Sequence, residues 1–209
     1  MLFENDFCMV FNKPSGLSVQ GGEGVKVSLD SILSEQYTPR PLLVHRLDRD
    51  TSGLMLFAKN ENTKRALQDN WADILLSRGY TAVVEGCPAA RRGTVTSWLK
   101  ETKTHLMYSS GIKGDGQQAV TNYRVVESSG GFSILDIRIE TGRKNQIRVH
   151  MKDIGHSIVG DRQYGTAKRT QNRLFLHAHL LEFKHPETGV VLRFETEIPK
   201  QFTALLKRN

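Results

Sequence analysis

A short stretch near the start of the chain gathers acidic and basic side chains in a pattern that suits catalysis. The sequence HRLDRDTSG at 45–53 holds two carboxylates, Asp48 and Asp50, among the guanidiniums of Arg46 and Arg49. It leads into the apolar run LMLFAK, which predicts a buried strand. Functional groups often lie on loops at strand ends, because the scaffold holds such loops in place. A salt-bridged loop without a catalytic role fits the same residues, so both interpretations stay open on this stretch alone.

A second group of titratable side chains lies in the segment TGRKNQIRVHMKDIG. Its apolar spacing predicts a helix that Thr141 caps, with Arg143, Lys144, Arg148 and His150 around its first turns. A basic helix start is unusual, because the helix dipole favours anions there. The pattern therefore suggests an anion supplied from elsewhere, such as a phosphate or a facing carboxylate. A solvated basic face accounts for the spacing equally well.

A third candidate is the sequence HAH, in which His177 and His179 share one face of a predicted strand. Two imidazoles so placed are suited to a metal ion, and a metal-dependent hydrolase is one hypothesis for the chain. However, an HxH pair without a nearby carboxylate is a weak metal signature. Structural or RNA-facing histidines are the preferred interpretation.

The elements that must position these groups are mostly strands with short connections. Helices are predicted at 27–37, 60–76 and 201–207, in addition to the segment from Thr141. Strands are predicted at 6–14, 54–59, 79–86, 93–100, 119–128, 132–140, 173–183 and 189–198. Ser28 is a plausible cap of the first helix, Pro14 ends the first strand, and the strand at 132–140 alternates apolar Leu135, Ile137 and Ile139 with charged residues. Strands outnumber helices, which predicts an α+β fold on a largely antiparallel sheet. No linker or repeat interrupts the sequence, so we expect one domain over residues 1–209.

Composition narrows the class of protein further. The 209 residues carry a formal net charge of +7, and the pI is near 9.5, which favours a polyanionic partner such as nucleic acid. No apolar run approaches the length of about 18 residues that spans a bilayer, and the first residues lack the pattern of a signal peptide. Cys8 and Cys87 both stand in apolar surroundings, which predicts two buried free thiols in a reducing, cytoplasmic compartment.

The two long motifs, HRLDRDTSG at 45–53 and TGRKNQIRVHMKDIGHSIVGDRQYG at 141–165, together resemble the RluA-type pseudouridine synthases. Shorter matches are VFNKPSGLSV, GYTAVVEG and LHAHLLEFKHP, which follow in family order over nearly the whole chain. The resemblance implies the pseudouridine synthase fold, a bent, largely antiparallel mixed sheet flanked by helices and loops, with an active-site cleft across it. Because the NKPSG block begins near residue 1, we expect a short member without an S4-type RNA-binding domain. Asn145 stands where many relatives have His, which discourages copying the substrate of any one relative.

The resemblance also implies a reaction, the isomerisation of uridine to pseudouridine in RNA. In this family the aspartate of H-R-L-D is essential, so Asp48 is the expected catalytic carboxylate, either attacking C1′ or abstracting a sugar proton. Arg148 matches the arginine of Q-I-R, and is expected to pair with Asp48 and keep it ionised. Tyr80 matches the family tyrosine that stacks on the target base. Asp50 falls where the motif requires no acid.

Further residues are expected to hold the RNA. The target uridine must be flipped out of a folded RNA, and Arg46 is expected to fill the vacated stack or hold the distorted loop. The other expected RNA contacts are Lys13, Arg143, Lys144, Gln146 and His150, and the segment 101–118 is a candidate RNA-contacting loop. We expect no metal, no cofactor, no membrane and no obligate protein partner, and a monomer acting on a stem-loop of rRNA or tRNA. The alternative is a catalytically idle RNA-binding or RNA-folding protein on the same scaffold.

Overall fold

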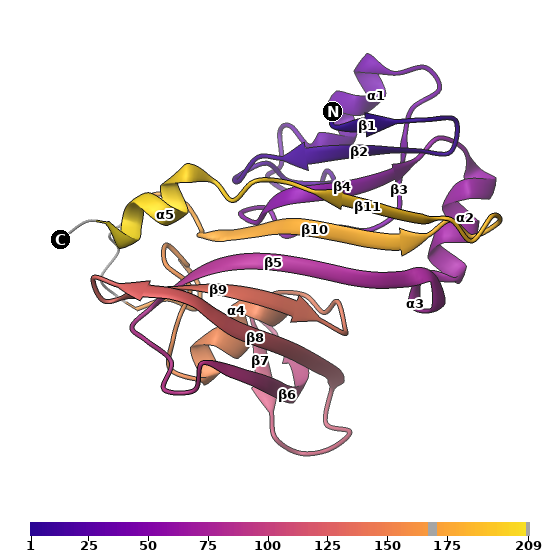
Figure 1. Cartoon of the computed structure of the whole chain (residues 1–209). Helices are drawn as coiled ribbons and strands as arrows, with labels where there is room; N and C mark the ends of the chain where they lie inside the picture. The colour runs from indigo at the N-terminus through magenta and orange to yellow at the C-terminus, as the bar shows by residue number, and fades with distance from the viewer. Residues whose placement is uncertain (167–170, 208–209) are drawn as a thin grey trace. The chain divides into compact units, whose positions relative to one another are not determined.

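The computed structural model describes residues 1–166 and 171–207, and the contacts within it divide the chain into two compact units. The first unit is formed by Met1–Arg78 together with Ala178–Glu197. The second is formed by Gly79–His177 and the residues from Ile198 onward. Most strands of each unit pair antiparallel with their neighbours, which confirms the predicted α+β class (Figure 1). No helix of the described residues is long and apolar enough to cross a membrane.

The first unit is built on a sheet with the strand order β1-β2-β4-β10. Its strands are β1 (Phe3–Glu4), β2 (Cys8–Lys13), β3 (Leu42–Leu43), β4 (Ser52–Ala58), β10 (Leu176–Lys184, of which the first two residues belong to the second unit) and β11 (Val191–Glu195). β3 pairs with β4, and β11 pairs with β10. The helices are α1 (Leu29–Gln36), α2 (Glu61–Asp69) and α3 (Trp71–Ile74).

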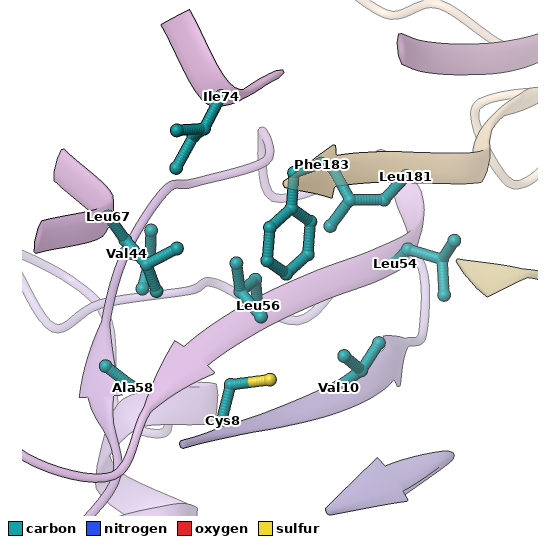
Figure 2. Packing of buried hydrophobic residues seen from close by; sticks show 10 residues of the cluster. All are labelled: Cys8, Val10, Val44, Leu54, Leu56, Ala58, Leu67, Ile74, Leu181 and Phe183. Carbon is teal, nitrogen blue, oxygen red and sulfur yellow. The ribbon is translucent and has the colours of Figure 1, made fainter. Parts of the chain in front are cut away.

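The core of this unit follows the two-residue period of its strands. One face of β4 presents Leu54, Leu56 and Ala58 to a cluster that also includes Leu67 of α2 and Phe183 of β10 (Figure 2). Every residue of β4 is buried, because the other face is covered as well. A strand covered on both sides is apolar throughout, which explains the uninterrupted LMLFA of the sequence.

The second unit holds a sheet with the strand order β5-β9-β8-β6-β7. The elements are β5 (Leu75–Glu85, of which the first four residues belong to the first unit), β6 (Arg92–Glu101), β7 (Met107–Ser110), β8 (Gln117–Ser129), β9 (Phe132–Ile139), α4 (Gln146–Asp153) and α5 (Lys200–Leu206). The alternation predicted for β9 is confirmed in the middle of the strand, where Leu135 and Ile137 are fully buried and Asp136 between them is half-buried, whereas Ile139 at the strand end is only half-buried.

Several local signals proved correct. Ser28 caps α1, where its hydroxyl accepts the backbone N–H of Ser31 at 3.1 Å and the Ser31 hydroxyl accepts the N–H of Ser28. β2 ends directly before Pro14, as expected of a residue that precedes proline. Capping and proline geometry depend on near neighbours, and can therefore be predicted from a short stretch of sequence.

Three predictions were wrong. The helix predicted over 60–76 breaks at Asn70, whose side chain donates to the carbonyl of Ala66, and β5 already begins at Leu75. The helix predicted from Thr141 begins only at Gln146, after a left-handed Asn145 with φ of 54°. Cys8 is buried as expected, but Cys87 is exposed in the connection after β5.

Candidate active site

Asp48 lies half-buried in the loop between β3 and β4, directly before the buried strand. The loop turns at this point, because the backbone N–H of Thr51 donates to the carbonyl of Asp48 at 3.1 Å. The structure therefore places the expected catalytic residue on a strand-end loop of the first unit, as the sequence predicted.

The neighbouring loop at residues 14–17 holds this turn in place through hydrogen bonds that involve main-chain groups. Gly16 exchanges hydrogen bonds with Arg49: its N–H donates to the Arg49 carbonyl at 3.0 Å, and its carbonyl accepts from Nε of Arg49 at 3.0 Å. The Ser15 hydroxyl donates to the carbonyl of Asp50 at 2.6 Å. The NKPSG stretch thus stabilises the conformation of the loop that carries Asp48.

Lys13 belongs to this support, in contrast to the phosphate contact expected for it. Its side chain is 1% exposed, and Nζ donates to the carbonyls of Pro14, Leu17 and Arg49 at 2.9–3.0 Å. Three acceptors match the three donors of an ammonium group. Burial and these bonds argue against a contact with phosphate and assign Lys13 a structural position beneath the loop.

His45 fixes the other end of the same motif. Its Nε2 accepts the backbone N–H of Leu56 at 3.2 Å, so the neutral ring carries its proton on Nδ1. The ring also stacks on Trp71, with centroids 5.5 Å apart. Burial, with a smaller contribution from the charge of Arg78, lowers the pKa of His45 to about 3. His45 is therefore a neutral structural residue at physiological pH.

Arg148 is held in the second unit by a buried ion pair. From the third residue of α4, its Nε and Nη2 donate to the two carboxylate oxygens of Asp161 at 2.8 and 2.7 Å. The side chains of Arg148 and Asp161 are 6% and 0% exposed. Burial raises the pKa of Asp161, but the hydrogen bond and charge of Arg148 and the backbone amides of Tyr164 and Gln163 outweigh it and hold this pKa below its usual value.

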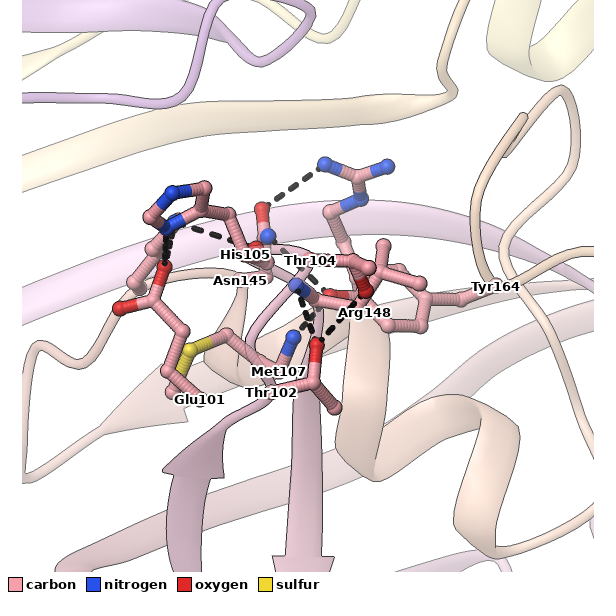
Figure 3. A network of polar contacts seen from close by, with 10 residues as sticks. Glu101, Thr102, Thr104, His105, Met107, Asn145, Arg148 and Tyr164 are labelled. Atoms are coloured by element: carbon pink, nitrogen blue, oxygen red, sulfur yellow. Dashed lines mark hydrogen bonds and ion pairs between the residues drawn. The ribbon is translucent and has the colours of Figure 1, made fainter.

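A chain of polar contacts continues from Arg148 toward β7 (Figure 3). Nη1 of Arg148 donates to the side-chain oxygen of Asn145 at 2.8 Å, and the amide of Asn145 donates to the Tyr164 hydroxyl at 3.2 Å. That hydroxyl also accepts the backbone N–H of Met107 at 2.9 Å. The guanidinium lies 5.0 Å from the centre of the Tyr164 ring. Asn145 thus links Arg148 to Tyr164 through its side-chain amide.

Tyr80 lies on β5, where it is 5% exposed and stands opposite Ile137 of β9. It belongs to the second unit, as Arg148 does, whereas Asp48 belongs to the first. The expected pairing of Asp48 with Arg148 and the expected stacking of Tyr80 on a base stay predictions.

Two expected RNA contacts are buried inside the second unit. Gln146 accepts from the Thr141 hydroxyl and the Arg143 amide and donates to the Val120 carbonyl and the Thr121 hydroxyl, all within 3.1 Å. His150 is 0% exposed and bonds the hydroxyls of Ser97 and Thr121 at 2.9 and 2.8 Å. Burial also lowers the pKa of His150. These positions argue against RNA contact. Both side chains instead bind α4 to neighbouring parts of the second unit.

The remaining expected contacts lie at the surface. Arg46 is exposed, and so are Arg143 and Lys144, which precede α4 instead of forming its first turn. Nε of Arg143 donates to the Gln118 carbonyl, and Nζ of Lys144 pairs with Glu101. Of the basic helix start inferred from the sequence, Arg143 and Lys144 lie in the loop before α4, whereas Arg148 lies in the first turn and is paired with the carboxylate of Asp161.

The histidines of the HAH sequence are buried on β10, with exposures of 2% for His177 and 9% for His179. In the described part of the chain, no group of three or more His, Cys, Asp or Glu side chains is gathered in a way that would hold a metal ion. This geometry favours the structural interpretation of the two histidines.

Comparison with known proteins decides the family. Residues 7–153, which include Asp48, Tyr80 and Arg148, match the family described as RNA pseudouridylate synthase. The chain belongs to this family. An uncharacterized RNA pseudouridine synthase of Bacillus subtilis, YlyB, is 34% identical over 98% of the chain and 71% of that protein. The ribosomal large subunit pseudouridine synthase D of Zymomonas mobilis is 34% identical over 99% of the chain and 71% of that protein.

Solved structures show the same fold. Human RNA pseudouridylate synthase domain containing 4 superposes with a TM-score of 0.80 at 23% identity, over 99% of the chain and 91% of that chain. The domain containing 1 protein gives 0.78 at 21% identity, over 100% and 94%. The chain is thus an RNA pseudouridine synthase of the RluA type, an isomerase that converts uridine in RNA to pseudouridine.

Reasoning from the sequence missed Asp161 and Tyr164, which surround Arg148. A signal was present, because DRQYG in the second long motif places an acid and a tyrosine three residues apart. The sequence does not show that this acid pairs with Arg148. Asp161 lies thirteen residues beyond Arg148, and the pairing becomes visible only in the fold, where the chain after α4 turns back.

Proposed function

We propose that this RNA pseudouridine synthase acts on large-subunit ribosomal RNA, with Asp48 as its catalytic carboxylate. The relatives named ribosomal large subunit pseudouridine synthase support this substrate, since they are about one-third identical over nearly the whole chain. A tRNA stem-loop is a second possible substrate. We also propose that both units serve one catalytic domain over residues 1–209, which works as a monomer in the cytoplasm without a protein partner.

In this proposal, Asp48 acts at the sugar. The bond between N1 and C1′ breaks, the uracil turns, C5 joins C1′, and the proton on C5 is lost while N1 gains one. Charge that develops on the ribose is stabilised by a nearby carboxylate, whether it attacks C1′ or removes a sugar proton. The turn at Asp48 and its support from residues 14–17 provide the rigid placement that either route needs.

Arg148 and Tyr80 assist this carboxylate in the proposed mechanism. Arg148 keeps Asp48 ionised, and the two bonds to Asp161 limit the orientations that its guanidinium can take. Tyr80 stacks on the uracil and holds it during the turn. The observation that carries the proposal is the turn at Asp48, which hydrogen bonds from Ser15 and Gly16 hold in place, because a carboxylate that acts on one sugar must be kept in a fixed position.

The test is to map pseudouridine by carbodiimide-dependent reverse-transcription stops in unmodified large-subunit rRNA and tRNA transcripts. We expect new stops with the wild type, and a loss of activity on the order of 10³-fold or more for Asp48→Asn. Asp50→Asn is the matched control, because it removes a carboxylate from the same loop, and it should keep most of the activity. Activity that survives Asp48→Asn would contradict the assigned carboxylate. RNA binding without stops on any transcript would favour the idle RNA-binding alternative.

A further inference from the structure

The first unit contains a cavity of about 480 Å³ that adjoins the catalytic loop. One wall is the chain segment 40–46, which runs into the HRLD motif, and another is formed by Lys64 and Gln68 on α2. Asp30 of α1 also lines it. We call it the Arg40 cavity. Its volume falls in the range of about 300–1,000 Å³ that is typical of ligand sites.

The lining of the Arg40 cavity has an excess of positive charge. Arg40, Arg46 and Lys64 are cationic, and Asp30 is the one carboxylate among the lining residues described. His45, which also lines the cavity, adds no charge at neutral pH, because its pKa is lowered to about 3. Both arginines are exposed, so their guanidiniums remain available to a ligand. The cavity is therefore suited to an anion.

The wall that carries the two arginines is held in place by contacts within the unit. The side-chain amide of Gln68 donates to the carbonyls of Val44 at 3.0 Å and Leu43 at 3.4 Å, which fastens the segment to α2. β3 pairs with the buried strand β4. His45, which directly precedes Arg46, is held by its stacking on Trp71. A site with so rigid a backbone has less conformational entropy to lose when a ligand binds.

We propose that the Arg40 cavity binds the phosphate backbone of the RNA strand next to the target uridine, an inference that rests on the proposed function. Arg46 connects the two sites, since it lines the cavity and stands two residues before Asp48. Guanidiniums match phosphate oxygens with paired hydrogen bonds, and the lysine adds a point charge. A strand held here on its backbone is positioned without being read for sequence.

The experiment measures the salt dependence of RNA binding by the full chain, with a labelled large-subunit rRNA transcript as the probe. Each phosphate that a cation neutralises contributes about 0.7–0.9 to the slope of log K against log salt concentration. The Arg40→Ala, Lys64→Ala double variant should reduce the slope by about 0.7 for each phosphate that it leaves without its cation. Arg65→Ala is the matched control, because Arg65 is an exposed cation on the same helix that does not line the cavity.

The outcomes separate this inference from the proposed function, because pseudouridine formation is measured on the same transcript. A reduced slope in the double variant and an unchanged slope in Arg65→Ala support the cavity as an RNA site, even if the wild type forms no pseudouridine in that transcript. An unchanged slope in the double variant overturns the inference, even if the wild type is fully active. A slope reduced as much by Arg65→Ala also overturns it, because the effect would then be one of overall charge.

Discussion

In the buried ion pair of Arg148 and Asp161, a large desolvation cost is set against strong hydrogen bonds within the second unit. Both are removed from water, and the cost of desolvating them is offset by two short hydrogen bonds and by the backbone amides that donate to Asp161. Such a pair contributes little net stability compared with apolar residues of the same size. Removing one partner is costly, however, because the other is left buried and uncompensated.

We therefore expect Asp161→Asn to lower the free energy of unfolding by about 3 kcal/mol or more. The amide that replaces the carboxylate is nearly the same size but carries no charge to balance Arg148. Urea unfolding monitored by circular dichroism measures the effect. Asp115→Asn is the control, because Asp115 pairs with Lys100 in a solvent-exposed bridge, where the same substitution should cost much less than in a buried pair. Equal losses in the two variants would show that the Arg148 pair has no special weight.

His45 gives the protein a pH dependence, because burial keeps this base neutral in the folded chain. Its folded pKa of about 3 lies below the ordinary value of 6.5, so the unfolded chain binds this proton more readily than the folded chain does. Stability that is fully present above pH 6.5 is therefore lost progressively as the pH falls toward about 3. The loss is at most about 1.4 kcal/mol for each pH unit in that window.

The variant His45→Gln should flatten this dependence, because Gln retains an oxygen that can accept the Leu56 N–H but does not titrate. The measurement is the free energy of urea unfolding between about pH 6 and about pH 4, compared as a slope rather than as an absolute value. His150 and Asp161 also lose stabilisation on acidification, so the variant should keep part of the slope. Identical slopes in the wild type and the variant would exclude His45 as the source.

At the scale of the element, β4 and β10 lie so close together at Gly53 that only glycine fits there. A Cβ atom added to Gly53 would lie 2.2 Å from the carbonyl oxygen of Ala178, and the φ of Gly53 is 120°. Backbone atoms on a paired strand cannot move away without disrupting the sheet, and a φ in this region is accessible essentially only to glycine.

Gly53→Ala is accordingly expected to lower the free energy of unfolding by about 3 kcal/mol or more. Thermal unfolding of the purified variant measures the change, and failure to accumulate folded protein is the same result in a stronger form. Gly21→Ala serves as the control, because a Cβ there meets nothing within 4 Å. A Gly53 variant as stable as the control would mean that the two strands separate at little cost.

The elements also show what sequence can predict. The cap at Ser28, the end of β2 and the alternation of β9 depend on neighbours along the chain, and all were predicted. The late start of α4 depends on a long-range contact, because the Thr141 hydroxyl accepts the Val120 amide and donates to Gln146 instead of capping a helix. The break at Asn70 accompanies a local bond to the Ala66 carbonyl, and the start of β5 at Leu75 was not recognised in the sequence. The motifs gave Lys13, Gln146 and His150 as RNA contacts, and only the fold shows that these three side chains are buried and hydrogen-bonded inside their units.

At the scale of the whole molecule, the charge and the reaction fit together. The net charge of +7 favours the binding of RNA. The cationic side chains divide into those that are buried and bonded inside the protein and those that are exposed to solvent. Lys13 and Arg148 are buried with acceptors, whereas Arg40, Arg46 and Arg143 remain at the surface. Affinity for RNA should therefore depend on the second set, whereas Lys13 supports the loop that carries Asp48 and Arg148 is bonded within the second unit.

The reaction should proceed without a metal ion or cofactor, because uridine and pseudouridine have the same composition. One bond to C1′ breaks and another forms, and no oxidant, reductant or phosphoryl donor is needed. We expect enzyme dialysed against EDTA to form pseudouridine at an unchanged rate on RNA that has been folded in monovalent salt and spermidine. Chemical probing of the same RNA must show the same fold with and without divalent ions, so that any effect belongs to the protein. Activity that disappears on dialysis and returns only with added Zn²⁺ would contradict this expectation and revive the metal-dependent interpretation of His177 and His179.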